Sequence, residues 1–306
     1  MSDISHSLLI LGGGPAGLTA ALYARRAGIP VTIWEEQYMP GGQMATTPEI
    51  ENVPGILLTD GYVLSETMAK QVMQLGAVIE TRAVTGLSLK PDKLLVEADG
   101  LSVTAKAIIL AMGARRRKLG IPGEDKFAGR GVSYCAVCDG NFFREKPVVV
   151  VGGGNTAFED ALHLANLGCS VRLIHRRNEF RASQKLQESV NAEPRITVAA
   201  PCLPIAIEGE NFVTGLQVKH IDSTAVETLA VSAVFVCVGT VANTELFKDW
   251  LELDSEGRII AGENTETSIP GVFAAGDIRK KPLYQIVTAA ADGAVAATRA
   301  AEFLRK

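Results

Sequence analysis

Residues 12–17 of this chain read GGGPAG, directly after the apolar run SLLIL at residues 7–11 and before helix-forming residues 18–26. A strand-like run, a glycine-rich turn and a helix-forming stretch in this order predict a βαβ unit. The second strand is expected at residues 31–34, and it ends in Glu35. The G-x-G-x-x-G turn, with an acidic residue about 20 positions further on, predicts a dinucleotide-binding fold.

The glycines of this turn have separate roles. Gly12 permits the tight turn, Gly14 lets backbone N–H groups approach a pyrophosphate, and Gly17 lets the helix pack closely on the strand. The helix N-terminus then faces the phosphates. Glu35 can accept hydrogen bonds from a ribose hydroxyl pair and would repel a 2′-phosphate, so this unit predicts a site for FAD or NAD. Spacing from the next glycine pair selects Glu36 instead; we expect Glu35.

The pattern recurs at residues 152–157 as GGGNTA, again between an apolar run and a helix-forming stretch. The strand that follows ends not in an acid but in His175, Arg176 and Arg177, with Arg181 close behind. Guanidinium groups match a 2′-phosphate in charge and geometry, so this unit predicts an NADP site. One such glycine motif also occurs in loops that bind no nucleotide. Two copies with opposite charges at the second strand favour two nucleotide sites.

Between the two units, residues 133–140 read SYCAVCDG and place Cys135 and Cys138 in a C-x-x-C. This spacing suits a redox-active disulfide or half of a zinc site. Zinc would need two further ligands, and the sequence has neither a second C-x-x-C nor a paired histidine motif, so we expect no metal. Small core or loop positions are expected for the three other cysteines, Cys169, Cys202 and Cys237.

Composition and charge exclude several classes of protein. The net charge of −4 comes from 34 acidic and 30 basic residues spread along the chain, which predicts no nucleic-acid or membrane partner. The 306 residues, 47% hydrophobic and 21% charged, are typical of about two globular domains. No basic segment precedes the first apolar run, so we expect no signal peptide and no membrane span. Five cysteines without an export signal favour the cytoplasm, where a close pair is more often catalytic than structural.

Together the motifs resemble the low-molecular-weight (bacterial-type) thioredoxin reductases, class II of the pyridine nucleotide-disulfide oxidoreductases, over nearly the whole chain. The resemblance rests on residues 12–17, 41–43 (GGQ), 51–55 (ENVPG), 135–140 (CAVCDG), 152–157, 175–182 (HRRNEFRA) and 269–277 (IPGVFAAGD). It implies an α/β fold of two Rossmann-like, three-layer ββα dinucleotide-binding domains, with the NADP domain inserted into the FAD domain. The expected FAD domain comprises residues 1–114 and 243–306, and the expected NADP(H) domain, which carries the cysteine pair, comprises residues 115–242.

The resemblance also assigns the cofactor sites. FAD is expected to contact Gly12, Gly14, Pro15, Ala16, Gly17, Glu35, Gly42, Gln43, Asn52, Gly113, Gly276, Asp277 and Gln285. NADP(H) is expected to contact Gly152, Gly154, Asn155, Thr156, Ala157, His175, Arg176, Arg177 and Arg181. Asp277 would hydrogen-bond the ribityl chain, and Gln285 would lie near the isoalloxazine. Met112, Tyr284 and Ala291 stand where the family commonly has Thr, Arg and Gly, which affects the fine contacts of the flavin site.

The activity implied is that of an NADPH-dependent thioredoxin-disulfide reductase. In this hypothesis a hydride passes from NADPH to FAD, and the electron pair continues to a Cys135/Cys138 disulfide. One cysteine, as thiolate, then attacks the disulfide of thioredoxin or a thioredoxin-like protein. The resemblance places Cys138 nearer the flavin but leaves open which cysteine attacks. Asp139 is expected to protonate a leaving thiolate, or alternatively to form the turn before Gly140.

The family further implies a homodimer and a rotation of the NADP domain, with hinges near residues 113–118 and 239–243. The nearest alternative is a related flavoenzyme with another donor, such as reduced ferredoxin, or another disulfide acceptor; the three arginines favour NADPH. A first strand beginning at Ser7 leaves no expected N-terminal thioredoxin-like module. A non-catalytic sensor that uses its cysteines as a redox switch is a second alternative.

Overall fold

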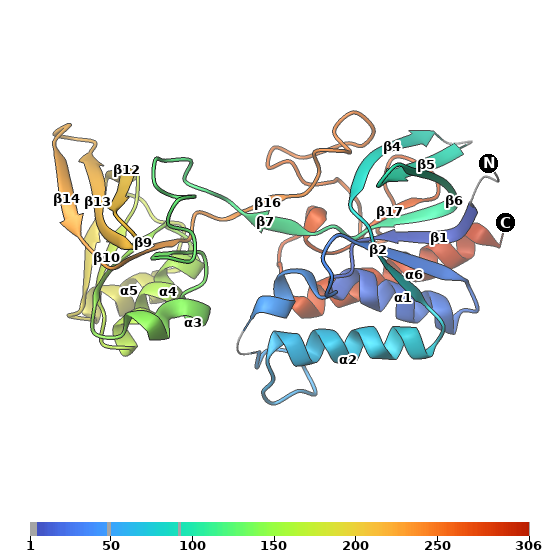
Figure 1. Cartoon of the computed structure of the whole chain (residues 1–306), viewed down its shortest axis with the longest axis horizontal. Coiled ribbons are helices and arrows are strands. Elements are labelled where there is room, and N and C mark those ends of the chain that lie inside the picture. The colour runs from blue at the N-terminus through green and yellow to red at the C-terminus, as the bar shows by residue number, and fades with distance from the viewer. Residues whose placement is uncertain (1–4, 48–49, 91–92, 306) are drawn as a thin grey trace. The chain divides into compact units, whose positions relative to one another are not determined.

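The computed structural model describes residues 5–47, 50–90 and 93–305, apart from the side chain of Cys138. The chain forms two compact units (Figure 1). Unit 1 comprises Met1–Arg115 and Val241–Lys306, and unit 2 comprises Arg116–Thr240. Unit 2 is therefore an insertion into unit 1. The boundaries fall at 115/116 and 240/241, beside the expected 114/115 and 242/243.

The central sheet of unit 1 has seven strands in the order β3-β2-β1-β6-β5-β4, with β17 paired to β6. The strands are β1 (Ser5–Leu11), β2 (Val31–Glu35), β3 (Val78–Thr81), β4 (Val84–Lys90), β5 (Lys93–Ala98), β6 (Leu101–Leu110) and β17 (Val272–Ala274). The pairs β2–β3, β1–β2, β1–β6 and β6–β17 are parallel, whereas the pairs β5–β6 and β4–β5 are antiparallel. Because β17 comes from the C-terminal segment, that segment completes the sheet begun by the N-terminal one, as the sequence predicted.

Unit 1 has three layers, and the buried second half of β1, residues 8–11, shows why that stretch is apolar. Leu8 and Ile10 pack on the face covered by α1 (Pro15–Arg26), α2 (Gly61–Gln74) and α6 (Ile286–Leu304). Leu9 and Leu11 pack on the opposite face, with side chains of β4 and β5. A parallel strand buried on both faces has no polar side to expose.

Helix α6 approaches α1 closely because its residues are small. A Cβ on Gly293 would come within 2.1 Å of the carbonyl oxygen of Ala16, so a larger residue would force the helices apart. This contact joins the C-terminal segment to the first glycine-rich turn. Neither α6 nor another helix of the described residues is long and apolar enough to cross a membrane.

Unit 2 repeats this architecture. Its parallel sheet has the order β11-β10-β9-β15-β8, and a separate antiparallel sheet has the order β12-β13-β14. The strands are β8 (Val132–Ser133), β9 (Pro147–Val151), β10 (Ser170–Ile174), β11 (Ile196–Ala199), β12 (Cys202–Gly209), β13 (Val213–His220), β14 (Val226–Ala230) and β15 (Ala233–Val236), and the helices are α3 (Ala136–Asp139), α4 (Asn155–Asn166) and α5 (Gln184–Ala192).

In β9, Val148 and Val150 pack with α4, whereas Val149 and Val151 pack with the antiparallel sheet. Helices therefore cover one face of the parallel sheet, and strands cover the other, as in unit 1. Both βαβ units expected around the glycine-rich turns are present. The predicted fold class, two three-layer ββα domains with one inserted into the other, is confirmed.

The two crossings between the units lie side by side. Strand β7 (Ala114–Arg116) pairs with β16 (Thr240–Ala242) in a two-stranded sheet. The amide of Asn243 donates to the carbonyl of Gly113 at 3.0 Å, and the amide of Arg117 donates to that of Gly239 at 2.9 Å. Both glycines have positive φ angles, +62° and +97°. A rotation at these residues, which the sequence suggested, remains a prediction.

Candidate functional site

The first glycine-rich turn requires glycine for steric reasons. A Cβ on Gly12, whose φ is +103°, would lie 2.4 Å from the carbonyl oxygen of Ala111, and one on Gly17 would lie 1.9 Å from that of Gly12. Gly14 is the N-cap of α1 and has no side chain to cap it, and Pro15 occupies the first turn. The first N–H groups of α1 are thus left for a ligand, and phosphate groups bind well at such a helix start.

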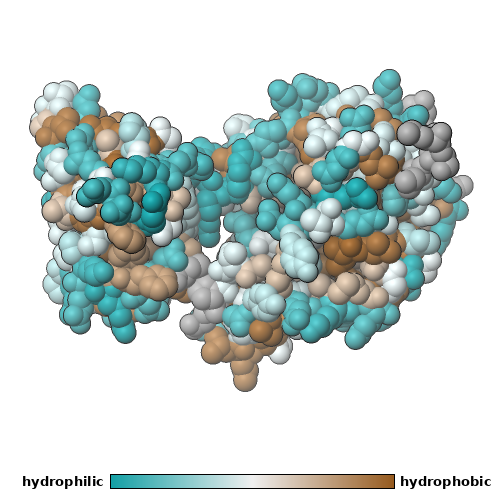
Figure 2. Space-filling model, in the orientation of Figure 1, coloured by the Kyte–Doolittle hydropathy of each residue, from teal (hydrophilic) through white to brown (hydrophobic). Residues whose placement is uncertain are grey.

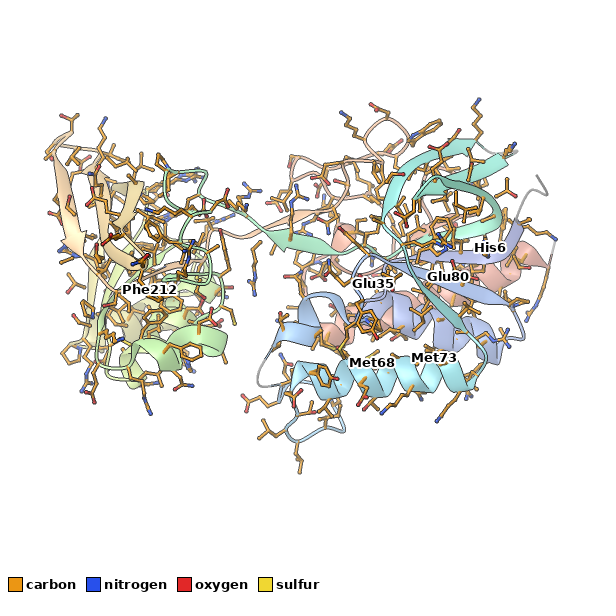
Figure 3. The ribbon with its side chains drawn as sticks, in the orientation of Figure 1. His6, Glu35, Met68, Met73, Glu80 and Phe212 are labelled. Carbon is orange, nitrogen blue, oxygen red and sulfur yellow. The ribbon has the colours of Figure 1, made fainter. Side chains whose placement is uncertain are left out.

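Glu35 lies at the end of β2, beside this turn (Figure 3). Its side chain is buried, and its carboxylate accepts hydrogen bonds from the amide of Gly13 at 2.6 Å and from that of Gln37 at 2.9 Å. Glu36, by contrast, is exposed. Of the two candidates for the ribose contact, the geometry favours Glu35, the residue we expected.

The C-terminal segment brings a second carboxylate to the same turn. Gly276 begins η3 (Gly276–Ile278), and its Cα lies so close to Ala16 that a Cβ would meet that side chain at 2.9 Å. The next residue, Asp277, has a buried Oδ1 with no hydrogen-bond partner among the described residues, although Lys281 Nζ lies 3.7 Å away. Burial raises the pKa of Asp277, and the charges of Lys281 and Arg258 lower it.

A buried oxygen without a hydrogen-bond donor is costly. A hydroxyl-bearing ligand at this point would supply the missing donor. Asp277 therefore fits the expected contact to a ribityl chain.

Other predicted flavin residues, far apart in sequence, also meet within unit 1. Asn52 Nδ2 donates to Gln285 Oε1 at 3.1 Å, and Gln285 is the N-cap of α6. Gln43, in η1 (Gly42–Thr46), donates through Nε2 to the carbonyl of Ala114 at 2.8 Å. A Cβ on Gly42 would lie 3.5 Å from Gly14 Cα, which places this segment against the glycine-rich turn.

Sequence analysis missed a buried charge network that fixes the Gly276–Asp277 loop to α6. Asp292 accepts from Arg279 Nε and Nη2 and from Lys281 Nζ, each at 3.1 Å, and from the amide of Gly276 at 3.0 Å. Asp292 and Arg279 are both buried. Removing one partner of such a set leaves a buried charge unpaired, which is strongly destabilising. The signal was available: Asp292 is an acidic residue within an alanine-rich helix.

The second glycine-rich turn is built in the same way. A Cβ on Gly152 would lie 2.3 Å from the carbonyl oxygen of Cys237, and one on Gly153 would lie 2.4 Å from the His175 imidazole. A Cβ on Gly154, the N-cap of α4, would meet nothing within 4 Å. Cys237 and His175 thus pack against the first two glycines of the turn, whereas the third, at the start of α4, leaves room for a phosphate group.

The segment after β10 gathers positive charge around this turn. Arg176, Arg177 and Arg181 are exposed, and the amide of Arg181 donates to the carbonyl of Gly153 at 2.7 Å. Burial lowers the pKa of His175, and the charges of the three arginines lower it further. The carbonyl oxygen of the Asn155 side chain accepts from the amide of Ser183 at 2.8 Å, which fixes the following loop to α4. These residues can offer guanidinium groups to a phosphate beside the turn.

The remaining two residues predicted to contact NADP(H) lie at the start of α4. Thr156 and Ala157 lie in its first turn, and Ala157 is fully buried against the core of unit 2. Ala157 therefore shapes the turn through packing. The loop after β10, which carries the three arginines, is held to the turn at its C-terminal end. There the amide of Ala182 donates to the carbonyl of Gly153 at 3.1 Å.

The C-x-x-C lies at α3. Cys135 is disulfide-bonded, whereas Cys169, Cys202 and Cys237 are free. The backbone of Cys138 is helical, but its side chain lies outside the described part of the structure. The predicted bond between Cys135 and Cys138 therefore stays a prediction.

Two side chains that sequence analysis missed hold this segment. The Ser133 hydroxyl donates to Asp139 Oδ2 at 2.6 Å and accepts from the amide of Cys135 at 3.1 Å. The Tyr134 hydroxyl donates to the buried Glu124 at 2.8 Å. Burial raises the pKa of Tyr134, and the hydrogen bond to Glu124 and its charge raise it further. Asp139 is thus tied to the residues that lead into Cys135, a position compatible with either role expected for it.

The two glycine-rich turns fit dinucleotides, each with an uncapped helix start and a charged residue at the end of the second strand. No group of three or more His, Cys, Asp or Glu side chains in the described part of the chain is arranged to hold a metal ion.

Comparisons with known proteins agree with this architecture. A family model described as pyridine nucleotide-disulphide oxidoreductase matches residues 6–294. A thioredoxin reductase of Streptomyces clavuligerus is 40% identical, over 99% of this chain and 95% of that protein. A bifunctional thioredoxin reductase/thioredoxin of Mycobacterium leprae (strain TN) is 41% identical, over 98% of this chain and 66% of that protein. The crystal structure of Lactococcus lactis thioredoxin reductase (FR conformation) superposes with a TM-score of 0.86 at 39% identity, covering 98% of this chain and 99% of that one.

Proposed function

Because this chain belongs to the low-molecular-weight thioredoxin reductases of the pyridine nucleotide-disulphide oxidoreductase family, we propose that it transfers electrons from NADPH through FAD to oxidised thioredoxin. The observation that carries the proposal is the pairing of two similar glycine-rich turns with opposite charge. Glu35 closes one turn, and His175 with its neighbouring arginines closes the other. The C-x-x-C lies in the unit that carries the arginines.

The family uses a flavin and a nicotinamide nucleotide, and the charges suggest which unit takes which. We assign FAD to unit 1, where the buried Glu35 suits a ribose and Asp277 offers a buried acceptor oxygen that has no hydrogen-bond donor among the described residues. We assign NADP(H) to unit 2, where guanidinium groups suit a 2′-phosphate. The remaining predicted contacts are assigned on the same basis.

When bound, the two cofactors supply the hydride and electron-pair chemistry. The chain's own residues bind and orient them through the two helix starts and the charged strand ends. Two electrons and two protons convert the Cys135/Cys138 disulfide into two thiols. One cysteine then attacks the partner's disulfide as a thiolate, and the second displaces the partner as its dithiol and re-forms the Cys135/Cys138 bond. Asp139, held by Ser133, can deliver a proton to a departing thiolate.

Steady-state turnover tests this proposal. The FAD-loaded protein should oxidise NADPH continuously when oxidised thioredoxin is present, and should stop after a single stoichiometric reduction when it is absent. Replacing NADPH by reduced ferredoxin tests the alternative donor: a ferredoxin-dependent enzyme would turn over with reduced ferredoxin and not with NADPH.

A protein that stops after one reduction even with thioredoxin present would be a redox sensor. An Asp139→Asn variant with unchanged turnover would assign Asp139 to the turn alone.

We further propose a cytoplasmic homodimer. Several apolar side chains of α1 and α2 are exposed, among them Tyr23, Tyr62 and Met73. Hydrophobic surface is also visible on unit 1 in Figure 2. Exposed apolar side chains on adjacent helices suit an interface with a second copy. Sedimentation of the FAD-loaded protein should give twice the chain mass, and a Tyr62→Glu variant should shift it towards the monomer.

A further inference from the structure

Unit 2 contains a second thiol site, outside the C-x-x-C. Cys202 begins β12 and lies directly opposite His220 of β13 in the antiparallel register. Glu227 of β14 lies opposite Val218, two residues before His220. Residues two apart in a strand share a face, as do directly opposed residues. The strand register alone therefore places a thiol, an imidazole and a carboxylate on one face of this sheet, whose β12–β13 turn carries Phe212 (Figure 3).

The side chains of these three residues form a relay. Cys202 Sγ lies 3.3 Å from His220 Nδ1, and His220 Nε2 lies 3.4 Å from Glu227 Oε2. Arg172 Nη1 donates to the other carboxylate oxygen of Glu227 at 3.0 Å. A carboxylate facing Nε2 favours the tautomer with its proton there, which leaves Nδ1 to accept from the thiol. Cys–His–carboxylate geometry of this kind allows the imidazole to remove the thiol proton during attack.

Access to the thiol is narrow. Cys202 is only 2% exposed and packs in the core between the two sheets of unit 2, whereas the side chain of His220 at the rim is 37% exposed. Burial raises the pKa of Cys202; the negative charges of Glu227 and Asp222 raise it further, and Arg172 lowers it. The thiol is therefore protonated at rest and needs a base to react. Large reactants are excluded.

We propose that Cys202 is an oxidisable thiol that reacts with small hydroperoxides, with His220 as the proton carrier and Glu227 as the residue that positions it. Sulfur attacks one peroxide oxygen, so an S–O bond forms and the O–O bond breaks. Sulfur is oxidised by two electrons to the sulfenic acid, and the peroxide is reduced. The thiol proton passes through Nδ1 to the departing oxygen, which leaves as water or an alcohol.

The other two free cysteines lack this arrangement. Cys169 Sγ donates to the carbonyl of Phe143 at 3.0 Å, which is not a base for this reaction. Cys237 Sγ donates to Asp160 at 2.9 Å, but burial raises the pKa of the Cys237 thiol well above its usual value, and the nearby Asp160 charge raises it further. Both serve as internal references for reactivity.

The site adjoins the predicted NADP turn, since the amide of Cys202 donates to the carbonyl of His175 at 2.8 Å. The proposed chemistry needs neither NADPH nor thioredoxin. It is therefore tested without them, and its failure would leave the proposed reductase activity untouched.

The experiment treats the FAD-loaded, as-isolated protein with hydrogen peroxide for set times, removes the peroxide with catalase, and unfolds the protein in the presence of dimedone so that buried sulfenic acid is labelled; peptide mass spectrometry then measures the label at each cysteine. We expect Cys202 to be labelled at least ~10-fold faster than Cys169 or Cys237. The rate of Cys202 labelling should fall at least ~10-fold in His220→Gln, which loses the general base. It should fall a few-fold in Glu227→Gln, which loses the group that orients that base. Glu208→Gln is the matched control, because Glu208 lies in the same sheet and hydrogen-bonds Gln217 instead. Its labelling should equal that of the unmodified chain.

Equal labelling of the three free cysteines, or an unchanged rate in His220→Gln, overturns the proposal. Circular dichroism and FAD retention establish that each variant is folded. If His220→Gln does not fold, the pH profile of the unmodified chain decides. A labelling rate that levels off once the imidazole is neutral supports a base, whereas a rate that rises tenfold with each pH unit indicates simple thiolate ionisation and contradicts it.

Discussion

The two glycine-rich turns occupy the same place in the same ββα architecture, yet a different residue covers the second glycine of each. In unit 1 that residue is Glu35, which lies over Gly13 and binds its amide. In unit 2 it is the imidazole of His175, which lies over Gly153 and is followed by three exposed arginines of the same loop. We propose that the fold fixes where a nucleotide phosphate lies, and that the charge at or just after the end of the second strand selects the ribose.

The largest expected effect is the loss of turnover when the redox cysteine pair, which only unit 2 is expected to carry, is broken. Cys135→Ser should lower thioredoxin-dependent turnover by roughly 10³-fold or more, since loss of one member of a catalytic pair removes most of its effect. FAD content should be unchanged because FAD is assigned to unit 1. Turnover with thioredoxin measures the loss, and Cys169→Ser is the matched control. Retained turnover in Cys135→Ser would remove the disulfide from the mechanism.

The arginines of unit 2 should account for the preference for NADPH. Each charged hydrogen bond contributes about 1.5–3 kcal/mol, so the double variant Arg176→Gln with Arg177→Gln should raise the KM for NADPH by roughly 10²-fold. The kcat/KM for NADH should hardly change, because NADH has no 2′-phosphate. Arg195→Gln, at an exposed arginine in the same unit, should leave both values unchanged. An equal loss with both nucleotides would indicate a structural role for the two arginines.

The corresponding change in unit 1 concerns FAD. Glu35→Gln removes the buried charge beside Gly13 and should weaken FAD binding by about 10-fold, as expected for a charged hydrogen bond to a ribose hydroxyl. Glu36→Gln alters an exposed neighbour and should have no effect. Titration of the FAD-free protein with FAD gives both dissociation constants. The reverse order of effects would transfer the ribose contact to Glu36.

These comparisons also show what the sequence could predict. Both βαβ units followed from glycine spacing and apolar runs, because such local patterns directly determine strand, turn and helix. Glu35 could be chosen over Glu36 only provisionally, since a one-residue shift at a strand end reverses which side chain is buried. Asp277 was recognised through a family motif, whereas the lack of a hydrogen-bond donor to its Oδ1 among the described residues is visible only in the folded chain.

Contacts between distant segments were not predictable. The pairing of Asp292 with Arg279 depends on how α6 packs against the loop after β17. The Cys202, His220 and Glu227 relay depends on the register of three strands, and the sequence suggested only a small core residue at Cys202. An acid within an alanine-rich helix marks Asp292 as unusual, but no local pattern identifies its partner or the members of the relay.

A smaller effect is expected at Ser133. Ser133→Ala removes the hydroxyl that holds Asp139 and should lower the rate of thioredoxin reduction by about 3- to 10-fold, as for the loss of about 1 kcal/mol from one hydrogen bond. The KM for NADPH should be unchanged. Stopped-flow reoxidation of the reduced protein by thioredoxin measures this step. An unchanged rate would mean that Asp139 needs no such support.

The smallest effect concerns pH. Burial lowers the pKa of His6 in unit 1 and of His175 in unit 2. The folded chain then binds fewer protons than the unfolded chain as pH falls through the usual histidine value of about 6.5, so stability is lost below it. His175→Gln should reduce the fall in Tm between pH 7.5 and 5.5 by about 2 °C or less. Melting curves of the FAD-loaded protein test this, and a larger fall in the variant would contradict the sign.

Anaerobic titration of the FAD-loaded protein with NADPH, and in parallel with NADH, tests the central claim most directly. If the charge after the second strand selects the nucleotide, NADPH should bleach the flavin absorbance at roughly 10²-fold lower concentration than NADH does, and oxidised thioredoxin should restore it. Equal bleaching by the two nucleotides, or bleaching by NADH alone, would contradict the assignment of the arginines to a 2′-phosphate.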